Sequence, residues 1–105
     1  MKDFKILVCE DDKNIANSIG LYLENEGFSV IYAYDGLEAI EVFKNQGADL
    51  IIMDLMMPRL SGEEAIKKLR DISFVPIIIL SAKSEDYDKV IGLNIGADDY
   101  ITKPF

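Results

Sequence analysis

The segment DLIIMD, residues 49–54, decides the fold of this 105-residue chain. Its four central residues are all apolar, without the alternation of polar and apolar positions that marks a strand with one face in water. Such a run is typical of a parallel strand inside a sheet that has helices on both faces. The segment PIIILS, residues 76–81, repeats the pattern. Two buried strands of this kind predict an α/β fold.

Segments of helical period separate these strands from three further strand candidates. The strands are expected at residues 4–10, 28–33, 49–54, 76–81 and 99–102, and the helices at residues 14–26, 37–45, 62–71 and 85–94. The first helix places Ile15, Ile19, Tyr22 and Leu23 on one stripe. Residues 29–32 and 99–102 are mixed in polarity, which suits edge strands. The alternation predicts a doubly wound sheet of five parallel strands.

The pattern ends early. After the fifth strand the chain reads KPF at residues 103–105, so the fold is expected to lack its final, fifth helix. That helix would normally cover part of one sheet face. We therefore expect either that the sequence is a piece of a longer protein or that a neighbouring molecule covers the apolar surface. The length is that of one domain, expected over residues 1–105.

The composition excludes several classes of function. The net charge is −8 and the isoelectric point about 4.4, which argues against direct binding of nucleic acid or of an anionic membrane surface. No signal peptide or membrane-spanning run is seen, so a cytoplasmic protein is expected. The absence of histidine excludes a His–Asp hydrolase triad, His-ligated zinc and a phosphohistidine within this chain. Cys9, the single cysteine, lies in an apolar run and is interpreted as a buried, inert thiol.

Polar side chains occur where the predicted strands end. In an open α/β sheet, ligands bind beyond the carboxyl ends of the strands, so these residues are expected to meet at one edge. Each of them alone also fits an ordinary role as a helix cap, a turn residue or a solvated amine. They are Glu10, Asp11 and Asp12 after the first strand, Asp54 at the end of the third, Ser81 at the end of the fourth and Lys103 after the fifth.

Three converging carboxylates repel one another, and a hard divalent cation relieves that repulsion. Mg²⁺ prefers oxygen ligands and commonly bridges a carboxylate to a phosphate. Asp54 would then act as the nucleophile, as in aspartyl-phosphate intermediates. The Lys103 ammonium would offset charge on the phosphoryl oxygens, and Ser81 would donate a hydrogen bond to them. These residues therefore predict a Mg²⁺-dependent, transient phosphorylation of Asp54.

Four stretches resemble the signature of the receiver domain of two-component response regulators. They are ILVCEDD at residues 6–12, DLMMP at 54–58 followed by Gly62, SAK at 81–83 and KPF at 103–105. The match spans nearly the whole chain in the family's order and spacing. It implies the flavodoxin-like strand order 2-1-3-4-5 and a function in phosphorelay signal transduction, with a sensor histidine kinase as phosphodonor. It implies no enzymatic activity beyond the domain's own phosphorylation and dephosphorylation.

The resemblance also implies a role for each site residue. Phosphate on the acceptor would draw the switch hydroxyl inward, and the switch aromatic ring would fill the vacated space, which reshapes the surface around the fourth helix and fifth strand. A cis peptide before Pro104 is implied as well. The matching positions are Glu10 and Asp11 for the metal-binding pair, Asp54 for the phosphoacceptor, Met56 for a backbone carbonyl ligand to the metal, Ser81 and Tyr100 for the switch, and Lys103 for the phosphate-pairing lysine.

Residues 92–105, with GADDY at 96–100, resemble the OmpR/PhoB subfamily. Its members usually carry a C-terminal winged-helix DNA-binding domain, which implies transcription regulation through an effector domain that this sequence does not contain. They dimerise through the fourth helix, fifth strand and fifth helix, and Lys89, Asp98 and Asp99 match residues of that face. Without the fifth helix, homodimerisation through this face stays in doubt. Lys89 and Asp98 fit ordinary solvated charges equally well.

Three other functions are open at this point. A phosphatase with an aspartyl nucleophile usually has a second Asp two residues further on, where this chain has Met56, which cannot transfer a proton. A receiver-like module that is never phosphorylated predicts a damaged site, whereas every expected side chain is present. A nucleotide- or flavin-binding domain is disfavoured because no glycine-rich loop follows the first strand.

Overall fold

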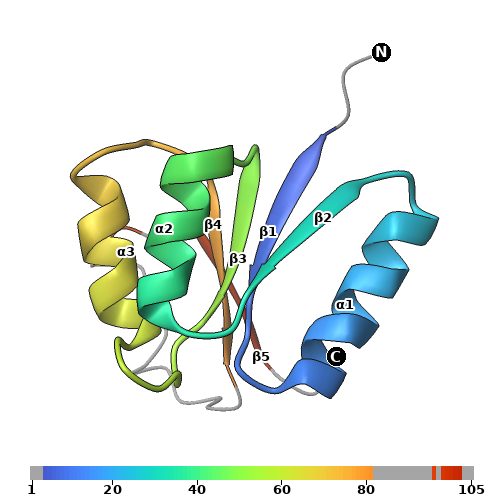
Figure 1. Cartoon of the computed structure of the whole chain (residues 1–105), viewed down its shortest axis with the longest axis horizontal. Helices are drawn as coiled ribbons and strands as arrows, with labels where there is room; N and C mark the ends of the chain where they lie inside the picture. The colour runs from blue at the N-terminus through green and yellow to red at the C-terminus, as the bar shows by residue number, and fades with distance from the viewer. Residues whose placement is uncertain (1–3, 82–95, 97, 103–105) are drawn as a thin grey trace.

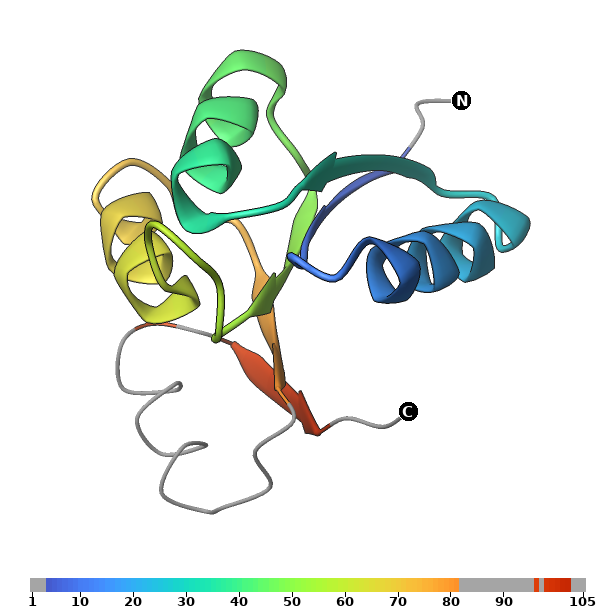
Figure 2. The ribbon, with the colours of Figure 1, turned by 60° about the horizontal axis from the view of Figure 1, so that its bottom comes forward.

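The computed structural model describes residues 4–81, 96 and 98–102, which form a parallel sheet with helices on both faces (Figures 1 and 2). The sheet has the order β2-β1-β3-β4-β5, and each neighbouring pair is parallel. The strands are β1 (Lys5–Cys9), β2 (Ser29–Ala33), β3 (Leu50–Asp54), β4 (Ile77–Ser81) and β5 (Asp99–Thr102). The helices are α1 (Lys13–Asn25), α2 (Gly36–Gln46) and α3 (Gly62–Arg70).

The predicted α/β architecture is confirmed, and the strand order is the one that the family resemblance implies. The predicted bounds of these elements agree with the observed ones to within one residue at each end. β2 and β5 lie at the two edges of the sheet, as their mixed composition suggested. The helix predicted at residues 85–94 lies outside the described residues.

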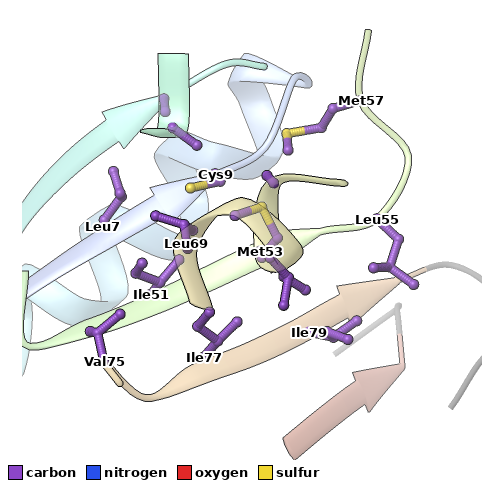
Figure 3. Close-up of a cluster of buried hydrophobic side chains, with 14 residues drawn as sticks. Leu7, Cys9, Ile51, Met53, Leu55, Met57, Leu69, Val75, Ile77 and Ile79 are labelled. Carbon is purple, nitrogen blue, oxygen red and sulfur yellow. The ribbon is translucent and has the colours of Figure 1, made fainter. Parts of the chain in front are cut away.

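The central strands are apolar throughout because both sheet faces are packed. Successive side chains of a strand point to opposite faces, and β3 shows this alternation. Ile51 and Met53 are fully buried in the core under α2 and α3 (Figure 3). Leu50 and Ile52 instead pack, partly buried, against the core on the α1 side. Covering both faces therefore turns the usual alternating pattern into the continuous run at residues 49–54.

The α1 face of the sheet is less completely covered than the opposite face. Within the part of the chain that the structure describes, α2 and α3 lie on one face and α1 lies on the other (Figures 1 and 2). An apolar surface on one face was predicted, and a groove of about 520 Å³ lies on the α1 side. Tyr22 borders it with 66% of its surface exposed. The lining residues are Ser18, Ile19, Tyr22, Leu23, Ile52, Ile78 and Leu80.

Cys9 is fully buried in β1, as predicted. Burial, reinforced by the negative charge of Glu38, raises the pKa of its thiol far above the usual value. The thiol is therefore protonated and unreactive in the folded protein. Among the described residues, no helix has both the length and the apolar composition needed to cross a membrane.

Candidate functional site

The carboxyl ends of β1 and β3 bring the first two site residues together. These strands are neighbours in the sheet, and Cys9 lies opposite Met53. Glu10 and Asp54 are the next residues along each strand, so both side chains reach the same edge of the sheet. The amide of Glu10 still belongs to the sheet, since it donates to the carbonyl oxygen of Ala33 at 3.0 Å.

Glu10, Asp11 and Asp54 form a cluster in which one carboxylate oxygen from each residue lies within 4.8 Å of the other two. Glu10 is 1% exposed and Asp54 is 4% exposed, whereas Asp11 is exposed to solvent. Buried carboxylates are rare in proteins unless they are paired or coordinate a metal. Three oxygen donors at this spacing, one of them open to solvent, fit a hard divalent cation. The convergence predicted for these three residues is confirmed.

The start of α1 separates the roles of two neighbouring aspartates. The Asp12 Oδ1 atom accepts hydrogen bonds from the amides of Asn14 at 2.9 Å and Ile15 at 3.2 Å, so Asp12 is the N-cap of α1. Its own amide donates to Glu10 Oε2 at 3.1 Å, which fixes that carboxylate. The sequence left open whether Asp11 or Asp12 caps the helix. The structure assigns the cap to Asp12 and places Asp11 in the acidic cluster.

The start of α3 packs directly on the backbone of Asp54. A Cβ atom on Gly62 would lie 2.1 Å from the Asp54 carbonyl oxygen, so only glycine fits at this position. The Gly62 amide donates to the carbonyl oxygen of Leu55 at 3.0 Å. The amide of Met56 donates to Asp54 Oδ1 at 3.3 Å. The start of α3 therefore packs on the main chain of Asp54, and the Met56 amide holds its carboxylate.

The remaining predicted site residues are only partly described. Ser81 ends β4 one residue beyond Leu80, which pairs with Asp54, and Tyr100 lies on β5 opposite Ile79. These positions agree with a site at the carboxyl edge. The side chains of Ser81, Tyr100 and Asp99, and all of Lys89, Lys103 and Pro104, lie outside the described part of the structure.

Asp98 makes contacts within the chain. Its Oδ2 atom accepts hydrogen bonds from the amide of Ile77 at 2.8 Å and from Arg70 Nη2 at 2.9 Å. Arg70 also donates from Nε to the carbonyl oxygen of Gly96 at 2.8 Å. Asp98 is 57% exposed, as a solvated charge would be, but its carboxylate also joins α3 to the start of β4. Its predicted role in a dimer face stays a prediction.

A second contact near the site, between Asp35 and Arg59, was not predicted from the sequence. Arg59 Nη2 lies 2.8 Å from Asp35 Oδ2. Asp35 precedes α2, and Arg59 lies between β3 and α3. No local pattern relates two residues on different loops, and the one available signal is that Arg59 lies in the short loop between Asp54 and Gly62.

The chain matches the response regulator receiver domain family over residues 6–105. It belongs to that family. Regulatory protein VanRc of Enterococcus gallinarum is 46% identical over 101 residues, which cover 96% of this chain and 44% of the relative. The alkaline phosphatase synthesis transcriptional regulatory protein PhoP of Bacillus subtilis is 47% identical over 102 residues, covering 96% of this chain and 42% of the relative. The chain thus spans less than half the length of these relatives.

Solved structures agree with this assignment. The receiver domain of the Francisella response regulator 1452 superposes with a TM-score of 0.93 at 42% identity, over 98% of this chain and 86% of that one. Chemotaxis protein CheY4 of Vibrio cholerae also reaches a TM-score of 0.93, at 32% identity, over 99% of this chain and 89% of that one. The predicted receiver fold is confirmed, and the curated relatives also bear out the OmpR/PhoB-type resemblance.

Proposed function

We propose that this domain accepts a phosphoryl group on Asp54 from a sensor histidine kinase, in a reaction that requires Mg²⁺. The observation that carries the proposal is the buried Asp54 carboxylate, with one oxygen each of Glu10 and Asp11 within 4.8 Å, at the carboxyl edge of a receiver fold. The chain contains no histidine, so a phosphohistidine donor has to lie outside this chain.

The chain's own residues would bind the cation and orient the nucleophile. Glu10, Asp11 and Asp54 would hold Mg²⁺ together with the main-chain carbonyl of Met56. Bound there, the ion supplies positive charge that offsets the carboxylates and the phosphoryl oxygens. The Met56 amide keeps the Asp54 carboxylate in one orientation through its hydrogen bond to Oδ1. The side chain of Met56 is 61% exposed, so its proposed contribution is made by the main chain.

In the transfer itself, an Asp54 oxygen attacks phosphorus and forms the O–P bond of an acyl phosphate. The P–N bond of the donor's phosphohistidine breaks, and its electron pair goes to the imidazole. Lys103 would pair with the phosphoryl oxygens, as the family resemblance implies. The same resemblance gives Ser81 and Tyr100 the switch that transmits the change to the surface around β5. No turnover of other substrates is proposed.

The output is proposed to be transcription regulation through a part of the protein beyond this domain. Support comes from the relatives, which include a transcriptional regulatory protein more than twice as long as this chain. Homodimerisation through the surface around β5 would be one way to transmit the signal. We also propose a cytoplasmic location, because ATP-dependent kinases and free Mg²⁺ are available there.

A labelling experiment with acetyl phosphate and Mg²⁺ tests the proposal. Mass spectrometry of the intact protein should show one added phosphoryl group, lost on treatment with hydroxylamine, and no added group on Asp54→Asn. The matched control is Asp12→Asn, which makes the same chemical change next to the cluster and keeps a good N-cap residue. It should be labelled like the wild type. Full labelling of Asp54→Asn would refute the assignment.

The phosphatase alternative gains no support from the structure. The residue two positions beyond Asp54 is Met56, which offers no acidic group for a leaving oxygen. Repeated hydrolysis of a phosphomonoester by the wild type, lost in Asp54→Asn, would be needed to revive it.

A further inference from the structure

The loop between β3 and α3 contains the one non-glycine residue with a positive φ among the described residues. This residue is Arg59, with φ of 65°. The amide of Leu60 donates to the carbonyl oxygen of Pro58 at 2.7 Å, so the chain makes a three-residue turn centred on Arg59. An L-residue rarely adopts this backbone conformation, and it persists only where surrounding contacts hold it.

Two contacts with the start of α2 hold this turn. Arg59 Nη2 and Nε lie 2.8 Å and 3.0 Å from Asp35 Oδ2. The other oxygen of Asp35, Oδ1, caps α2 by accepting from the amide of Glu38 at 2.8 Å. The second contact is between backbones, since a Cβ atom on Gly36 would lie 2.0 Å from the Leu60 carbonyl oxygen. The far end of the loop is thus fixed to α2.

The near end of the loop is fixed to the acidic cluster. Gly62 packs against the Asp54 backbone, and the amide of Met56 donates to the Asp54 carboxylate. Only Met57 and Pro58 separate Met56 from Arg59. Because so few rotatable bonds separate the two residues, a change in the backbone conformation of Arg59 is expected to move the Met56 amide that orients Asp54.

We propose that Asp35 and Arg59 are a positioning pair, which holds the β3–α3 loop in the conformation that orients the Asp54 carboxylate for Mg²⁺ and phosphoryl binding. This inference rests on the proposed function. The side chain of Arg59 is 60% exposed and that of Asp35 is 15% exposed. Because such a pair adds little to global stability, removing it changes the geometry at Asp54 more than it changes folding.

Two substitutions separate positioning from long-range electrostatics. Asp35→Asn keeps a capping residue for α2 and removes the ion pair. Arg59→Ala removes the same pair and leaves the neighbourhood more negative. Through-space electrostatics alone predicts that Arg59→Ala binds Mg²⁺ more tightly and that Asp35→Asn binds it more weakly. A positioning role predicts that both variants bind Mg²⁺ more weakly.

The experiment is an NMR titration of the 105-residue chain with Mg²⁺, combined with the rate of acetyl phosphate labelling. Both variants should raise the Kd for Mg²⁺ on the order of tenfold, the lower end of the effect of removing a supporting contact around a metal ligand. In the metal-free protein, the Met56 amide resonance should shift in both variants. Arg59→Lys, which keeps the charge, should recover part of the affinity. Thermal unfolding checks that each variant is folded.

Three results would overturn the inference. One is an unchanged Kd and an unchanged Met56 resonance in folded Asp35→Asn and Arg59→Ala. Another is opposite changes of Kd in the two variants, which would assign the effect to charge alone. The third is a wild type that binds no Mg²⁺, which would also remove the metal from the proposed function. If the wild type binds Mg²⁺ but takes no phosphoryl group, the proposed function fails and the titration alone decides the inference.

Discussion

Replacing Gly62 with alanine tests whether the contact between α3 and Asp54 shapes the site. The added Cβ would lie 2.1 Å from the Asp54 carbonyl oxygen, 2.8 Å from Leu55 Cα and 2.9 Å from the Asp54 carbonyl carbon. Real Cβ contacts are essentially never shorter than 3.0 Å, so the start of α3 must move by about 1 Å away from rigid backbone. That movement weakens the hydrogen bond from the Gly62 amide to Leu55.

The free energy of unfolding should fall by about 1–3 kcal/mol, the usual cost of overpacking a well-packed site. The loss of a main-chain hydrogen bond adds about 1 kcal/mol, and the better helix propensity of alanine offsets a similar amount. For a domain of this size, the melting temperature should drop on the order of 10 °C. Mg²⁺ affinity should fall as well, because the Asp54 backbone moves.

Gly47→Ala is the matched control for this substitution. Gly47 ends α2 with φ of 71°, and nothing lies within 4 Å of the position that its Cβ would occupy. Alanine there costs backbone strain of about 1 kcal/mol, far from the acidic cluster. Urea unfolding and Mg²⁺ titration on both variants check the prediction. A Gly62→Ala protein with the stability and Mg²⁺ affinity of the wild type would refute the reasoning.

Three further predictions concern acid stability, thiol reactivity and packing. Burial would raise the pKa of Asp35, but hydrogen bonds from Arg59 and the Glu38 amide lower it overall. The ionised carboxylate therefore stabilises the folded protein above the unfolded pKa of 3.8, and this stabilisation is lost as the pH falls through the lower folded pKa. In urea unfolding below about pH 4, the free energy of unfolding of Asp35→Asn should fall less on acidification than that of the wild type. Cys9 should react with a thiol reagent only after unfolding, and fast labelling of the native protein would contradict its burial. Leu69→Ala, at a fully buried side chain, should lower the free energy of unfolding by about 2–5 kcal/mol. Phe74→Ser, at a side chain 95% exposed, should change it by less than about 0.5 kcal/mol. Equal effects of the two substitutions would contradict the burial of Leu69 in the core.

Much of the fold follows from local sequence patterns. The continuous apolar run at residues 49–54 and the apolar stripes of the helices depend on neighbouring residues alone, so they can be predicted from the sequence. The acidic site was also predictable in part. The convergence of Glu10, Asp11 and Asp54 follows from one topological rule, that parallel strands end at the same edge of the sheet.

The tertiary structure decided which of several equivalent residues does what. Asp11 and Asp12 are alike in sequence, and the direction in which α1 leaves the sheet makes one a helix cap and the other a member of the cluster. The sequence fits Asp98 to a surface charge and singles out no role for Arg59, yet each is paired with a residue more than twenty positions away. Such pairs leave no periodic trace in the chain, because they arise only when separate loops are brought together by packing.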